Sequence, residues 1–152
     1  MKKMSGMLFK IMLAAAILCL TLTFIAGSVH AQRFVDNRDG TITDTKTHLM
    51  WSKDASPFGR LNWNDALIRC AVYDLAGHSG WRLPTAYEMI SLAEAIKSQD
   101  HPFTRIQSSH YWSSDYEKGS PNYAWRISMR FGSARAFNKA LSYHVWPVRS
   151  SE

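Results

Sequence analysis

The sequence predicts an α+β domain, because strand patterns stand on either side of two helical patterns. Short strand patterns come first, two amphipathic helical patterns follow, and further strand patterns fill the last forty residues. Helices and strands that are segregated in this way are typical of α+β domains. All six tryptophans lie after residue 50, and no repeat or low-complexity tract divides the chain. We therefore expect one domain with a tryptophan-rich core.

The first 31 residues have the features of a secretory signal peptide. Lys2, Lys3 and Lys10 form a basic start, residues 11–25 are almost uninterrupted apolar sequence, and residues 29–31 (VHA) carry the small side chains of a cleavage site. An uncleaved helical anchor is the alternative, since about 17 to 25 apolar residues can span a bilayer. With cleavage, residues 1–31 are the signal peptide and residues 32–152 are the exported domain.

Export limits where the protein acts and what holds it together. We expect it in the periplasm, secreted or on the cell surface, without a stable membrane span after cleavage. Cys70 would then be its single cysteine, so an internal disulfide is excluded. Because Cys70 lies in an apolar helical pattern, we expect a small buried residue rather than a nucleophile. Removing the three N-terminal lysines leaves 15 basic and 12 acidic side chains, a modest net charge.

Residues 33–51 are expected to form a hairpin. Asp39-Gly40 is a strong tight-turn dipeptide between two short strand patterns, and 49–51 (LMW) resumes an apolar strand. A calcium-binding loop containing Asn37, Asp39 and Gly40 is the alternative. It would place Val35 and Lys46 where such loops need carboxylates, so the turn is favoured.

Asn62 is well placed to cap the first helix, with Asp65 in its first turn. Apolar residues then recur at helical spacing, and Gly77 is expected to end the helix. These residues are Ala66, Leu67, Cys70, Ala71 and Leu75.

The second helix is predicted to start at Thr85, which has capping-box spacing to Glu88. Its buried stripe consists of Met89, Leu92, Ala93 and Ile96. Lys97 and Ser98 close the helix, and residues 101–110 form a polar connection. The histidines are scattered without the spacing of short zinc motifs, so no metal site is expected.

The terminal stretch combines a strand pattern with concentrated positive charge. Large apolar residues alternate with polar ones from Trp125 to Phe131, which predicts a strand with one buried face and one solvent-exposed face. Gly132-Ser133 supplies a turn, and residues 134–138 can return as a partner strand. No acidic residue occurs from Lys118 to Ser151, yet six basic ones do. The rest of the chain is then expected to be a scaffold for this surface.

The motifs together resemble the C-terminal domain family of the Legionella collagen-like adhesin. The resemblance covers residues 33–149 and rests on RFVDNRDGTITDTKTHLMW, the helix with Cys70, AGHSGWRLPTAYEM, YWSS and VWPVR. It implies a C-type-lectin-like fold with two helices, a sheet joining the two chain ends, and a second sheet bearing the ligand face. The family commonly has glycine where His48 stands, so the local turn is expected to be either altered or carried by a strained residue. Many members also have a cysteine near the closing strand that could pair with the helical cysteine. That neighbourhood is Trp146-Pro147 here, so the resemblance does not imply a disulfide for Cys70.

A second resemblance concerns residues 122–149, which look like the variable region of proteins diversified by retroelements. Adenine-directed mutation there rewrites asparagine codons on a fixed frame. The frame would comprise Ala124, Trp125, Ile127, Met129, Gly132, Lys139, Val145, Trp146, Pro147, Val148 and Arg149. The rewritable positions would be Tyr123, Arg126, Ser128, Arg130, Phe131, Ser133, Arg135, Ala136, Phe137, Asn138, Ala140, Leu141, Ser142 and Tyr143. None of these carries Lys, Gln, Glu, Met or Trp, which such mutation of an AAC codon cannot produce.

The leading functional hypothesis is a non-enzymatic, adhesin-like binding module without cofactor, catalytic residues or metal. Its ligand would be a polyanionic glycan or a surface protein, gripped by arginine forks and aromatic faces. The candidate ligand-binding residues are Tyr123, Arg126, Ser128, Arg130, Phe131, Arg135, Phe137, Asn138, Leu141 and Tyr143. A plain solvated basic face, a structural envelope protein and an enzyme related to the formylglycine-generating fold are the alternatives. Nucleic acid is not expected, because the domain is exported and its net charge is low.

Overall fold

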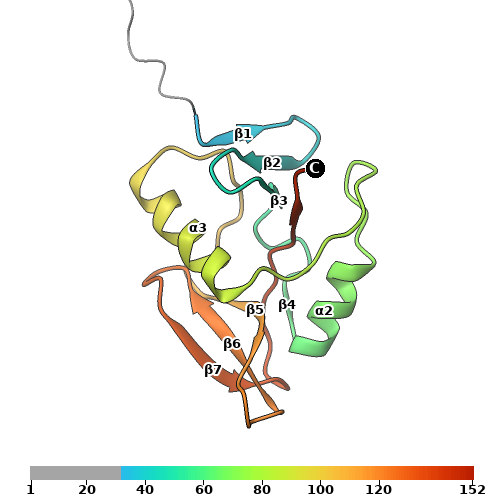
Figure 1. Cartoon of the computed structure of the whole chain (residues 1–152), viewed down its shortest axis with the longest axis vertical. Coiled ribbons are helices and arrows are strands. Elements are labelled where there is room, and N and C mark those ends of the chain that lie inside the picture. Colours follow the sequence, from blue (N-terminus) through green and yellow to red (C-terminus); the bar gives the residue numbers. More distant parts are fainter. Residues whose placement is uncertain (1–31) are drawn as a thin grey trace, which may run out of the picture. The chain divides into compact units, whose positions relative to one another are not determined.

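The computed structural model describes residues 32–152, and the predicted signal peptide lies outside them. Two antiparallel sheets and two helices build the described part (Figure 1). The first sheet has the order β1-β2-β3-β9. Its strands are β1 (Phe34–Asp36), β2 (Thr41–Asp44), β3 (Leu49–Ser52) and β9 (Val148–Ser150). The first and last strands of the domain therefore share one sheet.

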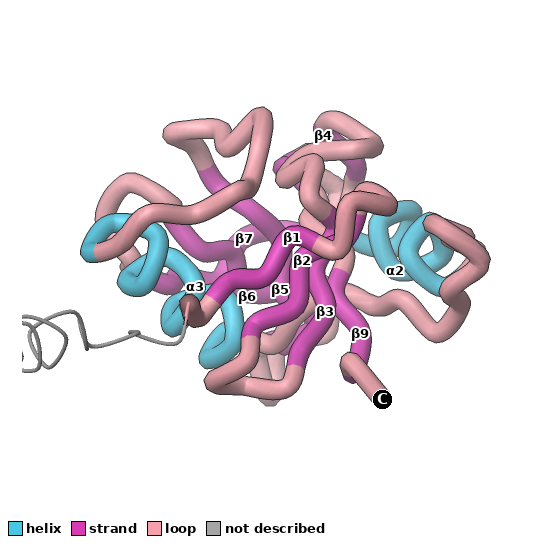
Figure 2. Tube along the Cα trace, turned by 90° about the horizontal axis from the view of Figure 1, so that it is seen from above, coloured by secondary structure: helices cyan, strands magenta, loops and turns pink. Residues whose placement is uncertain are grey.

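The second sheet has the order β4-β8-β5-β6-β7 and is antiparallel except for the parallel β5–β8 pair. Its strands are β4 (Arg60–Leu61), β5 (His110–Tyr116), β6 (Tyr123–Ser128), β7 (Ala134–Asn138) and β8 (Tyr143–His144). Figure 2 shows α3 (Ala86–Ser98) and α2 (Trp63–Ala71) on opposite sides of the strands. This single α+β domain agrees with the C-type-lectin-like arrangement that the family resemblance implies.

The helix starts are as the sequence predicts. The Asn62 side chain accepts a hydrogen bond from the Asp65 amide at 3.0 Å. Thr85 and Glu88 form the full capping box, with the Thr85 amide donating to Glu88 at 2.8 Å and the Glu88 amide donating to Thr85 at 3.2 Å. Arg82 also holds Glu88 with two 2.8 Å hydrogen bonds. The start of α3 is thus fixed by contacts local in sequence.

The end of the first helix differs from the prediction. Helix α2 stops at Ala71, and Val72 is its C-cap, so Leu75 is not part of it. Leu75 and His78 instead exchange backbone hydrogen bonds, at 3.3 and 3.0 Å, around the left-handed residues Ala76 and Gly77. Gly77 therefore serves a tight turn rather than a helix end.

Two cores lie on the two faces of the second sheet. The first joins it to α3 and to the first sheet, and includes Phe34, Ile42, Trp51, Met89, Leu92, Tyr111, Ile127 and Trp146. The second lies against α2 and includes Trp63, Ala66, Cys70, Leu83, Trp112, Ala124 and Val145. Each side chain in these two sets is at most 8% exposed. The tryptophans thus form the core that the sequence predicts.

His48 has a strained backbone, one of the two outcomes expected from its place in the family pattern. Its φ is 55°, in the left-handed region that favours glycine. Its hydrogen bonds to the described residues are all made by the backbone. The His48 amide donates to the Asp44 carbonyl, and the His48 carbonyl accepts from the amide and the hydroxyl of Ser151. Glycine would keep all three hydrogen bonds.

Replacing His48 by glycine should therefore stabilise the protein. A left-handed conformation costs a non-glycine residue about 1 to 2 kcal/mol, whereas the added entropy of unfolded glycine costs about 0.5 to 1 kcal/mol. We expect His48→Gly to raise the free energy of unfolding by about 0.5 to 1 kcal/mol in urea titrations. Lys46→Gly, in the same turn but without a left-handed backbone, is the control and should destabilise. An equal loss in both variants would contradict this account.

Candidate ligand-binding face

The register of β5, β6 and β7 gathers one set of predicted residues on the face of the second sheet that carries α2. Side chains alternate along a strand, so Ala124, Arg126 and Ser128 of β6 share this face. Arg135 of β7 is opposite Arg126, and Phe137 is opposite Ala124. Since Ala124 belongs to the α2 core, the arginines lie on the continuation of that face.

This continuation contains a hollow of about 270 Å³, here called the arginine hollow. Its lining combines two arginines, a histidine, two serines and two phenylalanines. These residues are His110, Arg126, Ser128, Phe131, Ser133, Arg135 and Phe137. Five of them are candidates named from the sequence, so the predicted site residues converge in part on one concave surface.

Arg126 lies against aromatic rings at the floor of the hollow. Its guanidinium carbon is 3.7 Å from the ring centre of Phe137 and 4.6 Å from that of Tyr143. Such contacts are favourable cation–π interactions. Its Nε atom is buried and lacks a hydrogen-bond partner among the described residues. Burial and the charge of Arg135 lower the pKa of Arg126, although the group stays charged at neutral pH.

No carboxylate balances this charge. In the described part of the chain, the ion pairs are formed by Arg33, Lys53, His78, Arg82 and Arg105, none of which lines the hollow. Arg126 and Arg135 occupy directly opposed positions on neighbouring strands, where like charges repel. The hollow is therefore a cationic site with unused hydrogen-bond donors, suited to a negatively charged group.

His110 is a lining residue that the sequence did not indicate. It faces Ser128 across the β5–β6 pair, and its ring lies edge-on to Tyr143 with centroids 5.9 Å apart. Burial, followed by the charges of Arg126 and Arg60, lowers the pKa of His110. His110 immediately precedes the recognisable YWSS motif, but only the strand register brings it to the arginines.

The other candidates lie elsewhere. The Tyr143 ring packs against the Arg126 guanidinium. Arg130 and Leu141 are exposed in turns outside the hollow. Tyr123 and Asn138 are opposed on the other face of the β6–β7 pair. The sequence-predicted set is thus divided between two faces of the hairpin.

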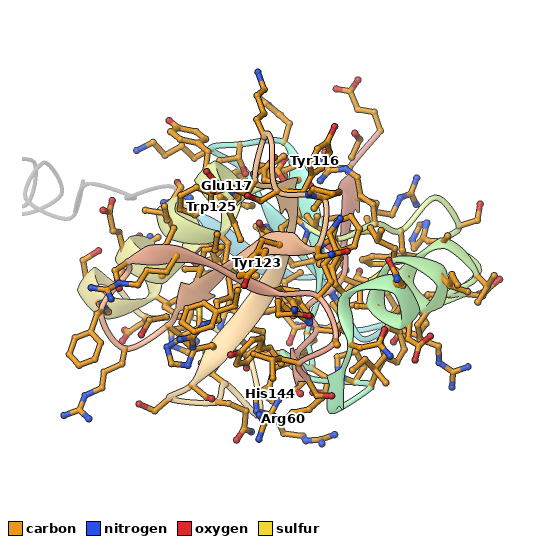
Figure 3. The ribbon with its side chains drawn as sticks, turned by 90° about the horizontal axis from the view of Figure 1, so that it is seen from below. Arg60, Tyr116, Glu117, Tyr123, Trp125 and His144 are labelled. Atoms are coloured by element: carbon orange, nitrogen blue, oxygen red, sulfur yellow. The ribbon has the colours of Figure 1, made fainter. Side chains whose placement is uncertain are left out.

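Trp125 differs from its expected role as a core residue of the terminal stretch. Ile127 is fully buried and Met129 is 4% exposed, but Trp125 is only half-buried and belongs to neither core. It stands opposite the small Ala136 of the edge strand β7, which leaves its ring uncovered on that side. Figure 3 shows it near Tyr123 and Glu117, close to the β5–β6 turn.

Ser128 also differs from its expected place on a solvent-exposed polar face. It is only 4% exposed, and its hydroxyl accepts a hydrogen bond from the Phe131 amide at 3.3 Å. Ser128 therefore shapes the turn after β6 as well as lining the hollow.

Two further hollows flank the second sheet. One, of about 410 Å³, is lined by Asn62, Asn64, Pro121, Asn122, Asn138, Lys139 and Ala140. The other, of about 530 Å³, lies over α2 beside the exposed side chains of Ile68 and Val72. Neither brings together charged groups without partners in the way that the arginine hollow does.

A catalytic or metal centre would depend on Cys70 or on clustered ligand side chains. Cys70 is fully buried, and burial raises the pKa of its thiol to about 12. Such a thiol is protonated at neutral pH and is a poor nucleophile. Within residues 32–152, no three His, Cys, Asp or Glu side chains come together in a way that could hold a metal ion. The same residues contain no helix long and apolar enough to span a membrane.

Comparison with known protein families identifies a match over most of the described domain. A family model described as the Lcl C-terminal domain matches residues 40–149. This range includes the whole second sheet and every residue that lines the arginine hollow. No curated protein matches the chain.

The opposed arginines predict a stability gain when one is removed. We expect Arg135→Gln to raise the free energy of unfolding by about 0.2 to 1 kcal/mol at low salt, because it relieves cross-strand repulsion. The gain should shrink in about 1 M salt, where the screening length is only about 3 Å. Arg130→Gln is the control, since Arg130 lies outside the paired register. Denaturant titrations at two salt concentrations measure both, and a loss of stability in Arg135→Gln would refute the argument.

Proposed function

The chain belongs to the Lcl C-terminal domain family, and on that premise we propose that it is an exported, non-enzymatic binding module whose arginine hollow receives an anionic group of its ligand. One observation carries this proposal: Arg126, packed against aromatic rings, is directly opposite Arg135, and no carboxylate lines the hollow. Two like charges directly opposite each other on neighbouring strands destabilise a sheet, and buried charged side chains are usually paired. A ligand oxyanion would supply that partner.

The chemistry of the hollow favours sulfate, phosphate or carboxylate groups on a larger ligand. A guanidinium presents planar pairs of N–H donors that match two oxygens of such a group. Phe131, which is 70% exposed at the rim, adds an aromatic surface for a sugar ring or an apolar side chain. A polyanionic glycan or an acidic surface protein meets both requirements.

Diversification of the hollow by a retroelement is part of the proposal. Six of its seven lining residues stand at positions named as rewritable from the sequence, and His110 is the exception. The proposed frame residues Ile127, Val145 and Trp146 are fully buried, which supports a division between fixed and variable positions. A neighbouring reverse transcriptase gene and a near-copy of the segment encoding residues 122–149 would be expected in the genome. The absence of both would remove the diversification proposal and leave the binding proposal unchanged.

The proposed location follows from the N-terminal residues. Their basic and apolar pattern is that of a signal peptide, so we place the domain outside the inner membrane: in the periplasm, on the cell surface or secreted. An anionic ligand of the cell envelope or of another cell would be accessible there.

The enzymatic alternative makes a separate prediction for Cys70. Because its thiol is buried and protonated, we expect Cys70→Ala to leave ligand binding unchanged and to lower the free energy of unfolding by about 1 kcal/mol. Heparin affinity and a urea titration measure the two quantities. A folded variant that had lost all function would restore the enzymatic hypothesis.

The binding proposal predicts salt-sensitive affinity for a polyanion. We expect the purified protein to bind heparin, with uncharged dextran as the negative control. Affinity should fall roughly tenfold when salt rises from about 0.05 to about 0.3 M, because ionic contacts are screened. Arg126→Gln/Arg135→Gln should cost about tenfold or more at low salt, since each pair of charge-assisted hydrogen bonds is lost.

The matched control removes the same charge elsewhere. Arg69→Gln/Lys46→Gln changes two exposed cations on α2 and in the β2–β3 turn, away from the hollow. It should keep most of the affinity. Equal losses in the two double variants would mean that net charge, not the hollow, binds heparin. Absence of heparin binding at low salt would exclude the polyanion and leave a surface protein as the ligand to test.

A further inference from the structure

The arginine hollow contains a titratable ring, His110, among its permanent cations. We propose that His110 is a proton-coupled ligand of the hollow: its imidazole takes up a proton when an oxyanion binds, so that affinity rises as the surroundings become more acidic. This inference rests on the proposed function and adds a regulating residue to it. His110 was not among the candidates that the sequence provided.

The position of His110 is fixed by its neighbours. It stands on β5 opposite Ser128, next to the β6 residue Arg126 in the lining, and its ring packs edge-on against Tyr143 of β8 at 5.9 Å. A ring held in this way can present a nitrogen atom to an oxyanion bound in the hollow without a large rearrangement. Its neighbourhood is therefore built into the sheet and not left to a mobile loop.

The groups that face His110 from the surrounding strands are cationic or neutral. They are Arg60 of β4, Arg126 of β6, Arg135 of β7 and Tyr143 of β8. No carboxylate lines the hollow. In the empty hollow, a proton on His110 would thus add a further positive charge beside Arg126 and Arg60. Burial, together with this repulsion, lowers the pKa of His110 from its ordinary value near 6.5.

A bound oxyanion reverses the electrostatic balance. An opposite charge within about 4 to 6 Å favours the charged form of a titrating group and shifts its pKa by about 1 to 3 units. The pKa of His110 is therefore expected to be lower in the free protein and higher in the complex. Between these two values, binding is accompanied by proton uptake.

The direction of the pH effect follows from linkage. Above the pKa of the complex, His110 is neutral in both states and contributes no charge to binding. As pH falls below that value, the complex gains a proton that the free protein does not hold, and affinity rises until pH passes below the pKa of the free protein. The total gain is about tenfold for each unit by which the two pKa values differ.

His144 provides a matched control on the same sheet. Its Nδ1 atom forms a 2.8 Å hydrogen bond with the Ser56 hydroxyl, and it does not line the hollow. Burial and Arg60 lower its pKa as they do for His110. Figure 3 shows His144 beside Arg60, away from the labelled residues of the β5–β6 turn. The pKa of His144 is thus lowered by burial and by Arg60 as that of His110 is, but His144 has no place in the lining.

The test uses inorganic sulfate, which stays a dianion throughout the range where histidine titrates. Sulfate is titrated into the protein at about pH 5 and about pH 8 at constant ionic strength, and binding is followed by NMR of the arginine Nε–H signals. We expect affinity at the lower pH to be about tenfold higher. The pKa of His110, read from its ring protons, should rise by about one unit in saturating sulfate.

Three substitutions test whether the pH dependence of sulfate affinity comes from the His110 ring. His110→Gln should bind sulfate with little dependence on pH, whereas His144→Gln should keep the dependence of the original protein. His110→Lys, which carries a permanent charge, should bind at about pH 8 nearly as tightly as the original protein does at about pH 5. Circular dichroism confirms that each variant is folded before it is titrated.

The outcomes separate this inference from the function it rests on. If sulfate binds with the same affinity at both pH values and the pKa of His110 does not move, His110 is not coupled and the binding function stands. If only His144→Gln removes the pH dependence, the coupling belongs to His144 and the inference is overturned. If neither sulfate nor heparin binds at either pH, both the inference and the polyanion function fail.

Discussion

The two sheets are held together by the burial of one indole, that of Trp146. Its ring is fully buried and meets Trp51 of β3, Phe103 of the connection before β5, and Tyr111 of β5 at centroid distances of 5.1 to 5.8 Å. Its N–H donates to the Ser52 carbonyl at 2.8 Å, so the polar atom is satisfied inside the core. Val145, the preceding residue, is equally buried but belongs to the other core. Consecutive side chains of the closing segment thus enter both cores and fix the path between the sheets.

This constraint explains why the β6–β7 hairpin can carry unusual side chains. The cores are completed by α2, α3 and the tryptophans, and the outer end of the second sheet contributes to them mainly through Ala124, Ile127 and Met129. Arg126 and Arg135 therefore have no role in filling a core. β7 is also an edge strand, where exposed charge opposes unwanted pairing with other strands. We therefore expect the fold to tolerate substitutions of Arg126 and Arg135.

The features that the sequence predicted are those set by local chemistry. The capping box of Thr85, the Asn62 cap, the hairpin at Asp39-Gly40 and the strand at residues 134–138 all depend on neighbours within a few positions. Charge and alternation likewise identified five of the residues that line the hollow.

What the sequence could not predict depends on pairing over long separations. His110 joins the hollow because β5 pairs with β6, and Arg60 approaches it because the two-residue strand β4 pairs with β8, more than eighty positions later. The partial exposure of Trp125 depends on Ala136 being the residue opposite it. No periodicity along one segment contains that register information. The faces of single strands were therefore predictable, but the composition of the shared surface was not.

The arginines of this protein differ in whether the chain provides a carboxylate partner for them. Arg33 holds both oxygens of the buried Asp44 at 2.8 and 2.7 Å, and Arg82 holds both oxygens of Glu88 at 2.8 Å. For these two arginines the chain supplies a carboxylate in bidentate geometry, which is the strongest arrangement for such a pair. Arg126 is partly desolvated as well, yet it has two aromatic rings beneath it and an opposing arginine instead. The rings offset part of the desolvation cost, but they leave its N–H donors unused. An oxyanion from outside the chain would give Arg126 the partner that Asp44 and Glu88 give to Arg33 and Arg82, and it would do so inside the arginine hollow.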